Sequence, residues 1–243
     1  MVAKKKKSRK SKKKRPIQIQ LGKIAFDLVL CFLALTIVPV IIYNWANPST
    51  TVLMWARWAE SDQSEKLPRA FQYWNPIEKI SPHLIKAVIA SEDQKFFVHN
   101  GFDWQAIESA IKVNITTKRK IGASTISMQT AKNVFLWQER TWLRKSLETY
   151  FTFLIEVVWG KVRIMEVYLN VIEWGDGIYG CEKASQVYFN HSCANLTPVE
   201  AAGLAAILPN PRKWSLIKPQ EHVGQRRARV LQMMNRVRLN RLD

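Results

Sequence analysis

Histidine, cysteine and acidic residues are scarce in this sequence, and each shortage narrows what the protein can be. The four histidines and three cysteines are scattered and show no zinc-ligand spacing, so a zinc protein is not indicated. Cys31 lies in an apolar stretch, whereas Cys181 and Cys193 could pair in an exported domain, a question that separation in sequence leaves open. No alternating run is long enough for a core sheet, which favours a mainly helical fold.

Acidic residues are so few that the formal net charge is +18, from 37 basic and 19 acidic residues. Residues 1–23 hold eleven of the basic residues and no acid. The run Lys4–Arg15 cannot bury a core, so we expect a solvated tail that acts as a topology signal. Nucleic-acid binding is the alternative, but no base-reading motif accompanies the run, and no nucleic-acid partner is expected.

An almost wholly apolar stretch, Ile24–Ala46, follows the tail, with Asp27 as its only charged residue. Its length is close to the roughly 20 residues that cross a bilayer as a helix. Tyr43 and Trp45 stand at its far end, where interfacial aromatic residues are expected. A cleaved signal peptide is usually shorter, and no clear small-residue cleavage site follows here. A buried core helix is the other alternative.

These features divide the sequence into four expected regions. They are a basic cytoplasmic tail at 1–23, a transmembrane helix at 24–46, a membrane-proximal connector at 47–80 and a domain at 81–243. Because positively charged flanks stay in the cytoplasm, the domain is expected on the other side of the membrane.

Two adjacent carboxylates, Glu92 and Asp93, end an apolar helical stretch. Ser81-Pro82 is a good helix start, with an N-cap residue followed by proline at the first helical position. Ile85, Val88 and Ile89 then place Glu92 on the apolar face of that helix. Because desolvation raises a carboxyl pKa, a Glu in such a place can exchange a proton near neutral pH. The alternative is a structural Glu at a helix end, paired with a nearby Lys or Arg.

The stretch Lys118–Asn133 looks like a site for an anion. A helix is expected at 104–116, a basic loop at 118–120, a turn with N-cap residues at 122–125 and a helix at 126–135. A helix N-terminus and cationic side chains together suit an anion. An ordinary solvated basic surface is the alternative.

Further helices are indicated in the second half of the chain. A long helix at 141–159 has an apolar stripe of Leu143, Leu147, Phe151 and Leu154 and ends at Gly160. Arg140, Arg144 and Glu148 stand four apart beside that stripe, and a surface ion pair worth at most about 1 kcal/mol is the plain interpretation. Shorter elements follow: a helical turn or two at 163–170, a glycine-rich loop at 175–180, a helix at 201–208 after the capping box Thr197–Glu200, and a basic amphipathic helix at 225–241 that rests on the core or on anionic lipid.

Five blocks of the chain resemble, in order, the peptidoglycan glycosyltransferase family that polymerises lipid II. They are Glu92-Asp93 with Phe96, His99 and Gly101; Gly122–Ile126 with Gln129, Lys132 and Asn133; Arg144-Lys145 with Glu148; Glu166 with Tyr168–Asn170, Gly175 and Gly180; and Glu200–Ala202 with Leu204 and Pro209. The resemblance implies a mainly α, lysozyme-like glycosyltransferase domain with one N-terminal transmembrane helix. No Ser-x-x-Lys motif stands where a transpeptidase domain would need it, so the membrane-anchored, monofunctional form is expected.

The resemblance also implies the residues of the site. Glu92 matches the catalytic base and Glu148 the second essential acid, whose role is left open between assisting the leaving group, orienting cations and holding a divalent ion. The implied substrate-binding residues are Asp93, Phe96, Ser124, Gln129, Lys132, Asn133, Arg140, Arg144 and Lys145. Mg²⁺ or Mn²⁺ is the implied cation, with no dedicated metal site in the sequence and no organic cofactor.

The expected partners are lipid II, the growing glycan strand, the membrane, and division or elongation proteins. The implied location is the bacterial cytoplasmic (inner) membrane, with the N-terminus in the cytoplasm and the domain outside it. A hydrophobic part of the domain is expected to dip into the membrane, and Phe102–Ile115 and Trp137–Trp142 are the candidates. A lysozyme-like enzyme that cleaves peptidoglycan, or a non-catalytic scaffold, is the alternative.

The chain departs from the family pattern at Met128, where two consecutive glutamines are usual and the sequence reads Met128-Gln129. A thioether cannot replace the donors and the acceptor of an amide. Affinity falls if that position contacts substrate, and nothing is lost if it packs inward.

Overall fold

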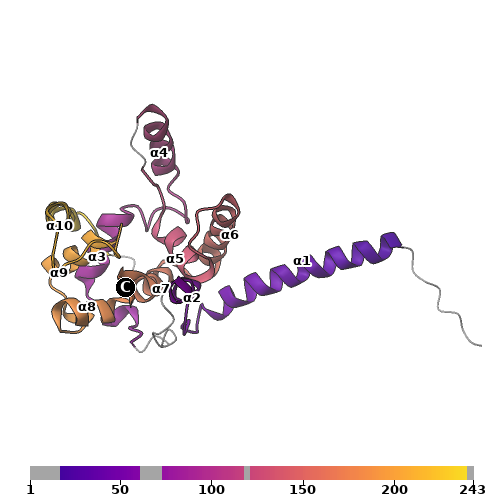
Figure 1. Ribbon diagram of the computed structural model, residues 1–243, viewed down its shortest axis with the longest axis horizontal. Coiled ribbons are helices and arrows are strands. Elements are labelled where there is room, and N and C mark those ends of the chain that lie inside the picture. Colours follow the sequence, from indigo (N-terminus) through magenta and orange to yellow (C-terminus); the bar gives the residue numbers. More distant parts are fainter. Residues whose placement is uncertain (1–16, 61–72, 118–120, 240–243) are drawn as a thin grey trace, which may run out of the picture. The chain divides into compact units, whose positions relative to one another are not determined.

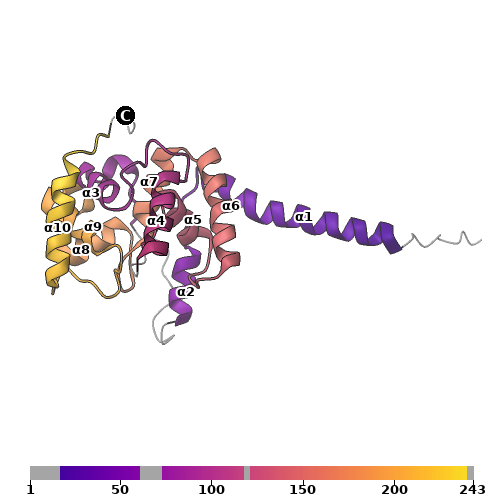
Figure 2. The ribbon, with the colours of Figure 1, turned by 90° about the horizontal axis from the view of Figure 1, so that it is seen from above.

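The computed structural model describes residues 17–60, 73–117 and 121–239 (Figures 1 and 2). The chain separates into two compact units, residues 1–39 and residues 40–243, and each is taken by itself. Most of the expected basic tail and the whole basic loop 118–120 lie outside the described residues. The fold is mainly helical, as the sequence predicted.

Helix α1, Ile17–Ile42, accounts for the first unit and the beginning of the second. Its stretch Leu21–Ile42 has 22 residues and is long and apolar enough to cross a membrane, since about 1.5 Å of rise per residue carries it across a hydrocarbon core of about 30 Å. The helix begins and ends earlier than the expected 24–46. Tyr43 and Trp45 therefore follow the helix instead of forming its last turn.

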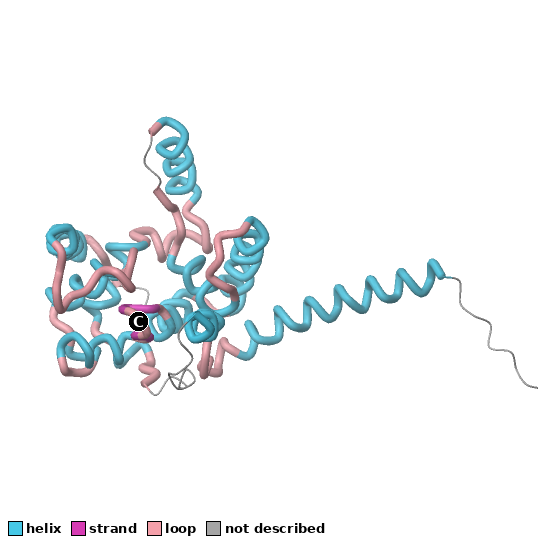
Figure 3. The backbone as a smooth tube through the Cα atoms, viewed as in Figure 1, coloured by secondary structure: helices cyan, strands magenta, loops and turns pink. Residues whose placement is uncertain are grey.

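The second unit contains short helices around a helical core, and only a small hairpin among its described residues is β-structure (Figure 3). In chain order its elements are α2 Val52–Glu60, η1 Ile77–Lys79, α3 Pro82–Glu92, α4 Trp104–Thr116, α5 Ile126–Phe135, α6 Trp142–Val158, α7 Lys161–Val171, β1 Glu173–Gly175, β2 Ile178–Tyr179, α8 Cys181–Phe189, η2 Cys193–Asn195, α9 Pro198–Ile207 and α10 Glu221–Met234.

The starts of the helices that matter for the site are fixed by local capping. An N-cap side chain accepts a hydrogen bond from a backbone N–H of the first turn in α3, α4, α5, α6 and α9; the caps are Ser81, Asp103, Thr125, Thr141 and Thr197. Each cap satisfies a donor that the helix leaves without an internal partner. This explains why the sequence located these starts correctly.

The core is built from two groups of helices. Helix α3 packs against α9 and α10, while α5 packs against α6 and α7, and Figure 2 shows the two groups on opposite sides of the second unit. Helices α7 and α9 are deeply buried, because every residue from Val167 to Val171 and from Ala201 to Ile207 is buried. Glu92 ends α3 and Gln129 lies on α5. A hydrogen bond between their side chains connects the two groups of helices.

Several elements differ from the sequence prediction. Helix α7 is longer than the one or two turns expected at 163–170, and the glycine-rich loop at 175–180 contains the β1–β2 hairpin. Helix α8 was not predicted. Helix α10 begins and ends earlier than 225–241, and Val230 and Met234 pack into the core. The sequence had left open whether this helix rests on the core or on anionic lipid. The structure shows it resting on the core.

The apolar stripe predicted for α6 is partly wrong. Phe151 is buried, but Leu143 is 66% exposed. The buried face of α6 instead runs through Arg144, Glu148 and Thr152 to Ile155. Three of the five buried residues of α6 are therefore polar or charged, on a face that hydrophobicity alone would have made apolar.

The expected connector 47–80 is in part a packed piece of the second unit. Helix α2 contacts α5, and η1 contacts α7. Arg163 donates to the carbonyls of Tyr43 and Ala46 at 2.9–3.0 Å. These carbonyls follow a helix end and have no partner within the helix, so the guanidinium satisfies them.

Cys181 and Cys193 lie side by side in the interior. Both are free thiols with no exposed surface, and their Sγ atoms are 3.2 Å apart. Burial raises the pKa of the Cys181 thiol well above its ordinary value, with the hydrogen bond to Cys193 acting in the same direction. A raised pKa disfavours the reactive thiolate. The structure thus shows the two cysteines as close neighbours without a disulfide bond between them.

Candidate active site

Glu92 is held by contacts from three directions at the end of α3. Its Oε1 accepts from the Ser91 hydroxyl at 3.0 Å and lies 3.4 Å from Arg226 Nη2 on α10. Its Oε2 accepts from Gln129 Nε2 on α5 at 3.1 Å. The side chain is 13% exposed. The carboxylate is thus fixed in place and is still reached by solvent.

Gln129 is itself oriented by Tyr168 of α7. The Tyr168 hydroxyl donates to Gln129 Oε1 at 3.1 Å, which leaves the amide N–H₂ to face Glu92. Burial raises the pKa of Tyr168 well above its ordinary value, and the charge of Glu92 adds to the effect, so the hydroxyl stays a donor. Gln129 was expected to bind substrate; here its amide connects Tyr168 to Glu92.

Asp93 and Phe96 point into the protein. His99 Nε2 lies 2.9 Å from Asp93 Oδ2, and the same oxygen accepts from the backbone N–H of Ile126, the first residue of α5, at 3.0 Å. An anion at a helix N-terminus is favourable. The Asp93 side chain is 3% exposed and Phe96 has no exposed surface. Their expected contact with substrate has no support in this geometry, which makes them supports for the loop after Glu92.

Gly101 connects the first block to the second. Its φ of +88° disfavours other residues, and an added Cβ would lie 3.0 Å from side-chain atoms of Thr152 and Glu156. Its carbonyl accepts from the Thr125 hydroxyl at 2.6 Å, at the start of α5. Ser124, one residue earlier, is exposed. The glycine therefore allows the two blocks to approach closely.

A cluster of cationic side chains surrounds Glu148 on α6. Arg144 Nη1 donates to Glu148 Oε2, and Lys145 Nζ donates to Oε1 at 2.5 Å. The residues Arg144 and Glu148 are 9% and 3% exposed. The plain interpretation of the spacing was a surface ion pair, and that alternative is wrong; the resemblance had implied residues of the site instead. The pair is buried, so removing Glu148 would leave the charge of Arg144 uncompensated.

Lys132 belongs to the same cluster. Burial lowers the pKa of Lys132 from its ordinary value, while the negative charge of Glu148 acts in the opposite direction and the nearby cations Arg144, Arg57 and Lys145 lower it further. The ammonium group is therefore a partly desolvated cation among other cations. Such a group binds a strongly charged anion better than a solvated lysine does.

The other expected site residues are dispersed. Asn133 is buried on α5, at 8% exposure. Arg140 is exposed and precedes α6, which begins at Trp142, so it does not continue the helical row of Arg144 and Glu148 as the spacing had suggested. Its contact with substrate stays a prediction.

Two arginines close to the site were missed by sequence reasoning. Arg57 of α2 lies near Lys132 and also donates to Glu173 Oε2 at 3.3 Å. Arg226 of α10 lies beside Glu92. Both stand outside the five blocks, and neither has a local sequence signal, because each reaches the site through helix packing.

Glu166 and Asn170 of the fourth block bind a preceding stretch of chain, while Tyr168 of the same block orients Gln129 in the site. Glu166 accepts from the backbone N–H of Ile77 at 3.0 Å. The Asn170 side chain both accepts from the N–H and donates to the carbonyl of Asn75, at 2.9 and 2.8 Å. Motif residues here satisfy backbone groups that would otherwise be buried without partners.

Met128 packs inward and is 5% exposed, so the departure from the family pattern removes no surface contact. We expect Met128→Gln to lower the free energy of unfolding by about 1–3 kcal/mol, because a buried amide replaces a thioether. We expect no gain in turnover. Denaturant unfolding measures the first quantity, and Met128→Leu, which keeps volume and polarity, is the control. A Gln variant that is as stable as the wild type and more active would show that this side chain reaches substrate.

The described residues do not fit a metal cage. They contain no group of three or more His, Cys, Asp or Glu side chains placed to hold a metal ion. Both oxygens of Glu148 are already engaged by cations. Mg²⁺ or Mn²⁺ bound by this chain alone is therefore not supported, and no chemistry is assigned to a metal here.

The two halves of the site are joined by α5. Gln129 and Lys132 are three residues apart on that helix, a rise of about 4.5 Å along its axis. Through Gln129 this helix holds the Glu92 carboxylate, and through Lys132 it contributes to the cations around Glu148. This arrangement suits a reaction in which a proton is removed at one point while negative charge develops on a leaving group at the other.

Comparison with known proteins gives a consistent result. The family model described as Transglycosylase matches residues 62–235. A biosynthetic peptidoglycan transglycosylase of Bdellovibrio bacteriovorus is 51% identical over 84% of this chain and 81% of its own length. Proteins with the same name from Bacteroides thetaiotaomicron and Rhodospirillum centenum are 48% and 49% identical, over 92% and 86% of this chain and 90% and 89% of theirs.

Proposed function

Because this chain belongs to the transglycosylase family, we propose that it polymerises lipid II into the glycan strands of peptidoglycan. The observation that carries the proposal is that α5 carries both Gln129, which holds the Glu92 carboxylate, and Lys132, which lies among the cations around Glu148. A glycosyl transfer from a pyrophosphate needs both parts, since one activates the acceptor and the other stabilises the departing anion.

Glu92 acts as the general base in this proposal. The 4-hydroxyl of the acceptor sugar attacks the anomeric carbon of the lipid-linked strand, and Glu92 takes the hydroxyl proton. The new glycosidic C–O bond forms as the bond to the pyrophosphate breaks, with inversion at the anomeric carbon. Gln129, held by Tyr168, keeps the carboxylate aimed during this step.

The cations stabilise the departing undecaprenyl pyrophosphate. Lys132 is the central one, and Arg140 is assigned here by family resemblance. Arg144 and Lys145 are held by Glu148, which we assign to orienting them, because both of its oxygens already accept from them. Preorganised charges of this kind stabilise a transition state because they need no rearrangement as it forms. The reaction as proposed needs no organic cofactor and no metal held by the protein.

Exposed apolar residues support contact of the second unit with the membrane. Ala110 is the one residue of α4 that is buried, whereas Trp104, Ile111 and Ile115 are 71%, 52% and 78% exposed. Trp142 at the start of α6 is 90% exposed. Figure 1 shows α4 projecting from the body of the second unit. Apolar surface of this kind marks a membrane or protein contact, and a lipid-borne substrate makes the membrane the better explanation.

The topology we propose is a single-pass anchor in the bacterial inner membrane, with the basic tail in the cytoplasm and residues 47–243 outside. It is supported by the apolar helix Leu21–Ile42 and the lysines before it. A reporter active only outside the cytoplasm, fused after Asp243, tests it. Activity of a cytoplasm-specific reporter at that position would reverse the orientation.

The rivals are a peptidoglycan-cleaving enzyme and a scaffold for division or elongation proteins. A hydrolase has no need of the cations around Glu148, which favours transfer from a pyrophosphate. The full-length protein in detergent, supplied with lipid II, is expected to make glycan polymer and to release no fragments from finished cell wall. Fragment release without polymer would establish that the protein is a hydrolase. If neither polymer nor fragments formed, a non-catalytic scaffold would be the remaining alternative.

A further inference from the structure

Arg226, on the C-terminal helix α10, places a positive charge beside Glu92, the proposed base. Its Nη2 donates to the Ser91 hydroxyl at 2.9 Å and lies 3.4 Å from Glu92 Oε1. Ser91 in turn donates to the same carboxylate oxygen at 3.0 Å. Helix α10 packs against both α3 and α9, so the guanidinium is delivered by a packed element and not by a loose tail.

The contacts of Arg226 are not those of a purely structural ion pair. Its Nε is buried and has no hydrogen-bond partner within the described parts of the chain. A buried donor left unpaired destabilises a fold, so the fold alone gives a weak reason for this guanidinium. Among the described residues, its salt-bridge partner is Glu92.

The carboxylate of Glu92 is consequently held at both oxygens by different elements. The neutral amide of Gln129 on α5 takes Oε2, while Ser91 on α3 and the cation of Arg226 on α10 take Oε1. Tyr168 of α7 is a further titratable group that interacts with this carboxylate. Helix α9 contributes the Ala205 carbonyl, which accepts from Ser91 at 3.2 Å, and its only charged side chain, Glu200, stands at its distant N-terminus.

We propose that Arg226 is a positioning residue for the general base: with Ser91 it fixes one oxygen of Glu92 and places a positive charge beside the carboxylate that receives the acceptor proton. The proposal rests on the assignment of Glu92 as base in the proposed function. A cation at this distance favours the charged form of a carboxyl group. Because the Arg226 side chain is 30% exposed, solvent weakens the effect.

The test is the pH dependence of polymerisation by full-length variants. Arg226→Gln is expected to lower kcat about tenfold with little change in KM, and to move the acid limb of the profile to higher pH, because the ionised base loses its cation. Arg226→Lys, which keeps the charge, is expected to retain the acid limb of the wild type with a smaller loss of rate.

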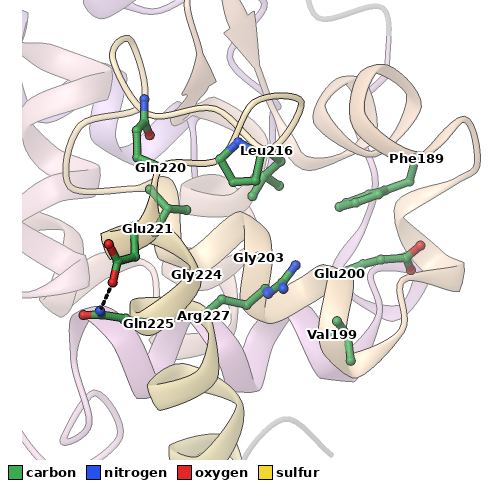
Figure 4. Close-up of a pocket in the computed structure, with 12 residues that line it drawn as sticks. Phe189, Val199, Glu200, Gly203, Leu216, Gln220, Glu221, Gly224, Gln225 and Arg227 are labelled. Atoms are coloured by element: carbon green, nitrogen blue, oxygen red, sulfur yellow. Dashed lines mark hydrogen bonds between the residues drawn. The ribbon is translucent and has the colours of Figure 1, made fainter.

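Arg227→Gln is the matched control. Arg227 is the next residue of α10 and lines a cavity of about 410 Å³ with Gly203, Leu216 and Gly224 (Figure 4). The close-up shows its side chain extending across Gly203 toward Val199 and Glu200. This variant removes the same charge from the same helix, and we expect the wild-type pH profile.

The outcomes separate the two assignments. If Arg226→Gln has the wild-type profile, or if it loses rate and melting temperature together with no movement of the acid limb, Arg226 is not a positioning residue. Glu92→Gln is measured in the same assay. If the wild type makes polymer and Glu92→Gln does not, the proposed function stands, whatever Arg226 does.

Discussion

The Glu92→Gln variant is expected to polymerise lipid II about 10²–10⁴-fold more slowly than the wild type, which is the usual contribution of a general base. The amide has nearly the shape of the carboxylate and can still accept from Ser91, but it cannot take the proton of the acceptor hydroxyl. The measurement is the initial rate of polymer formation by full-length protein in detergent.

Glu78→Gln is the control for this variant. Glu78 is an exposed carboxylate in η1, and its replacement removes the same charge at a distance from the site. We expect its rate to equal that of the wild type. If Glu92→Gln polymerised lipid II at near the wild-type rate, Glu92 would not be the general base and another group would have to take the proton.

Lys132→Met is expected to lower turnover by about 10²–10³-fold, the scale of losing one preorganised group that stabilises charge in a transition state. Its melting temperature is expected to equal or exceed that of the wild type. The reason is that burial lowers the pKa of Lys132, so the folded protein holds this charge at a cost. After the change Glu148 still accepts hydrogen bonds from Arg144 and Lys145, so its buried carboxylate is not left unpaired.

The sign of the pH effect follows from the direction of that shift. The unfolded chain keeps the Lys132 proton up to its ordinary pKa of 10.5, whereas the folded protein releases it at a lower pH. Between the two values the unfolded state binds more protons, so the stability of the wild type rises with pH through that window. Lys132→Met lacks this rise, and thermal unfolding at several pH values measures it.

Lys79→Met is the control, since Lys79 is exposed in η1. It is expected to keep both the turnover and the melting temperature of the wild type. If Lys132→Met lost turnover and melting temperature in parallel, the lysine would have a structural role, and the cation for the leaving group would have to be sought at Arg140 or Arg57.

The elements that carry the site were readable because their signals are local. Ser81-Pro82 starts α3, and helices expected at 104–116 and 126–135 match α4 and α5 at both ends. Because capping depends on a few consecutive residues, a helix start can be predicted before the fold is known. Helix α8 escaped notice because its first turn has no side-chain cap, and its start depends on Gly180.

The burial of charged residues was not readable in the same way. Arg144 and Glu148 stand four apart on a helix, a spacing that exposed and buried pairs share. Only the packing of α6 on α5 shows that this pair lies inside. The same holds for Asp93, whose carboxylate turns inward because the start of α5 and His99 lie behind it.

The sequence by itself determined the helical class and the apolar span, and its resemblance to the family predicted Glu92, Glu148 and Lys132 as residues of the site. Tertiary structure alone decided what surrounds them. Arg226 is 134 residues from Glu92 along the chain, and no periodicity or motif connects positions so far apart. Their contact exists because α10 packs on α3 and α9, which is a property of the folded core.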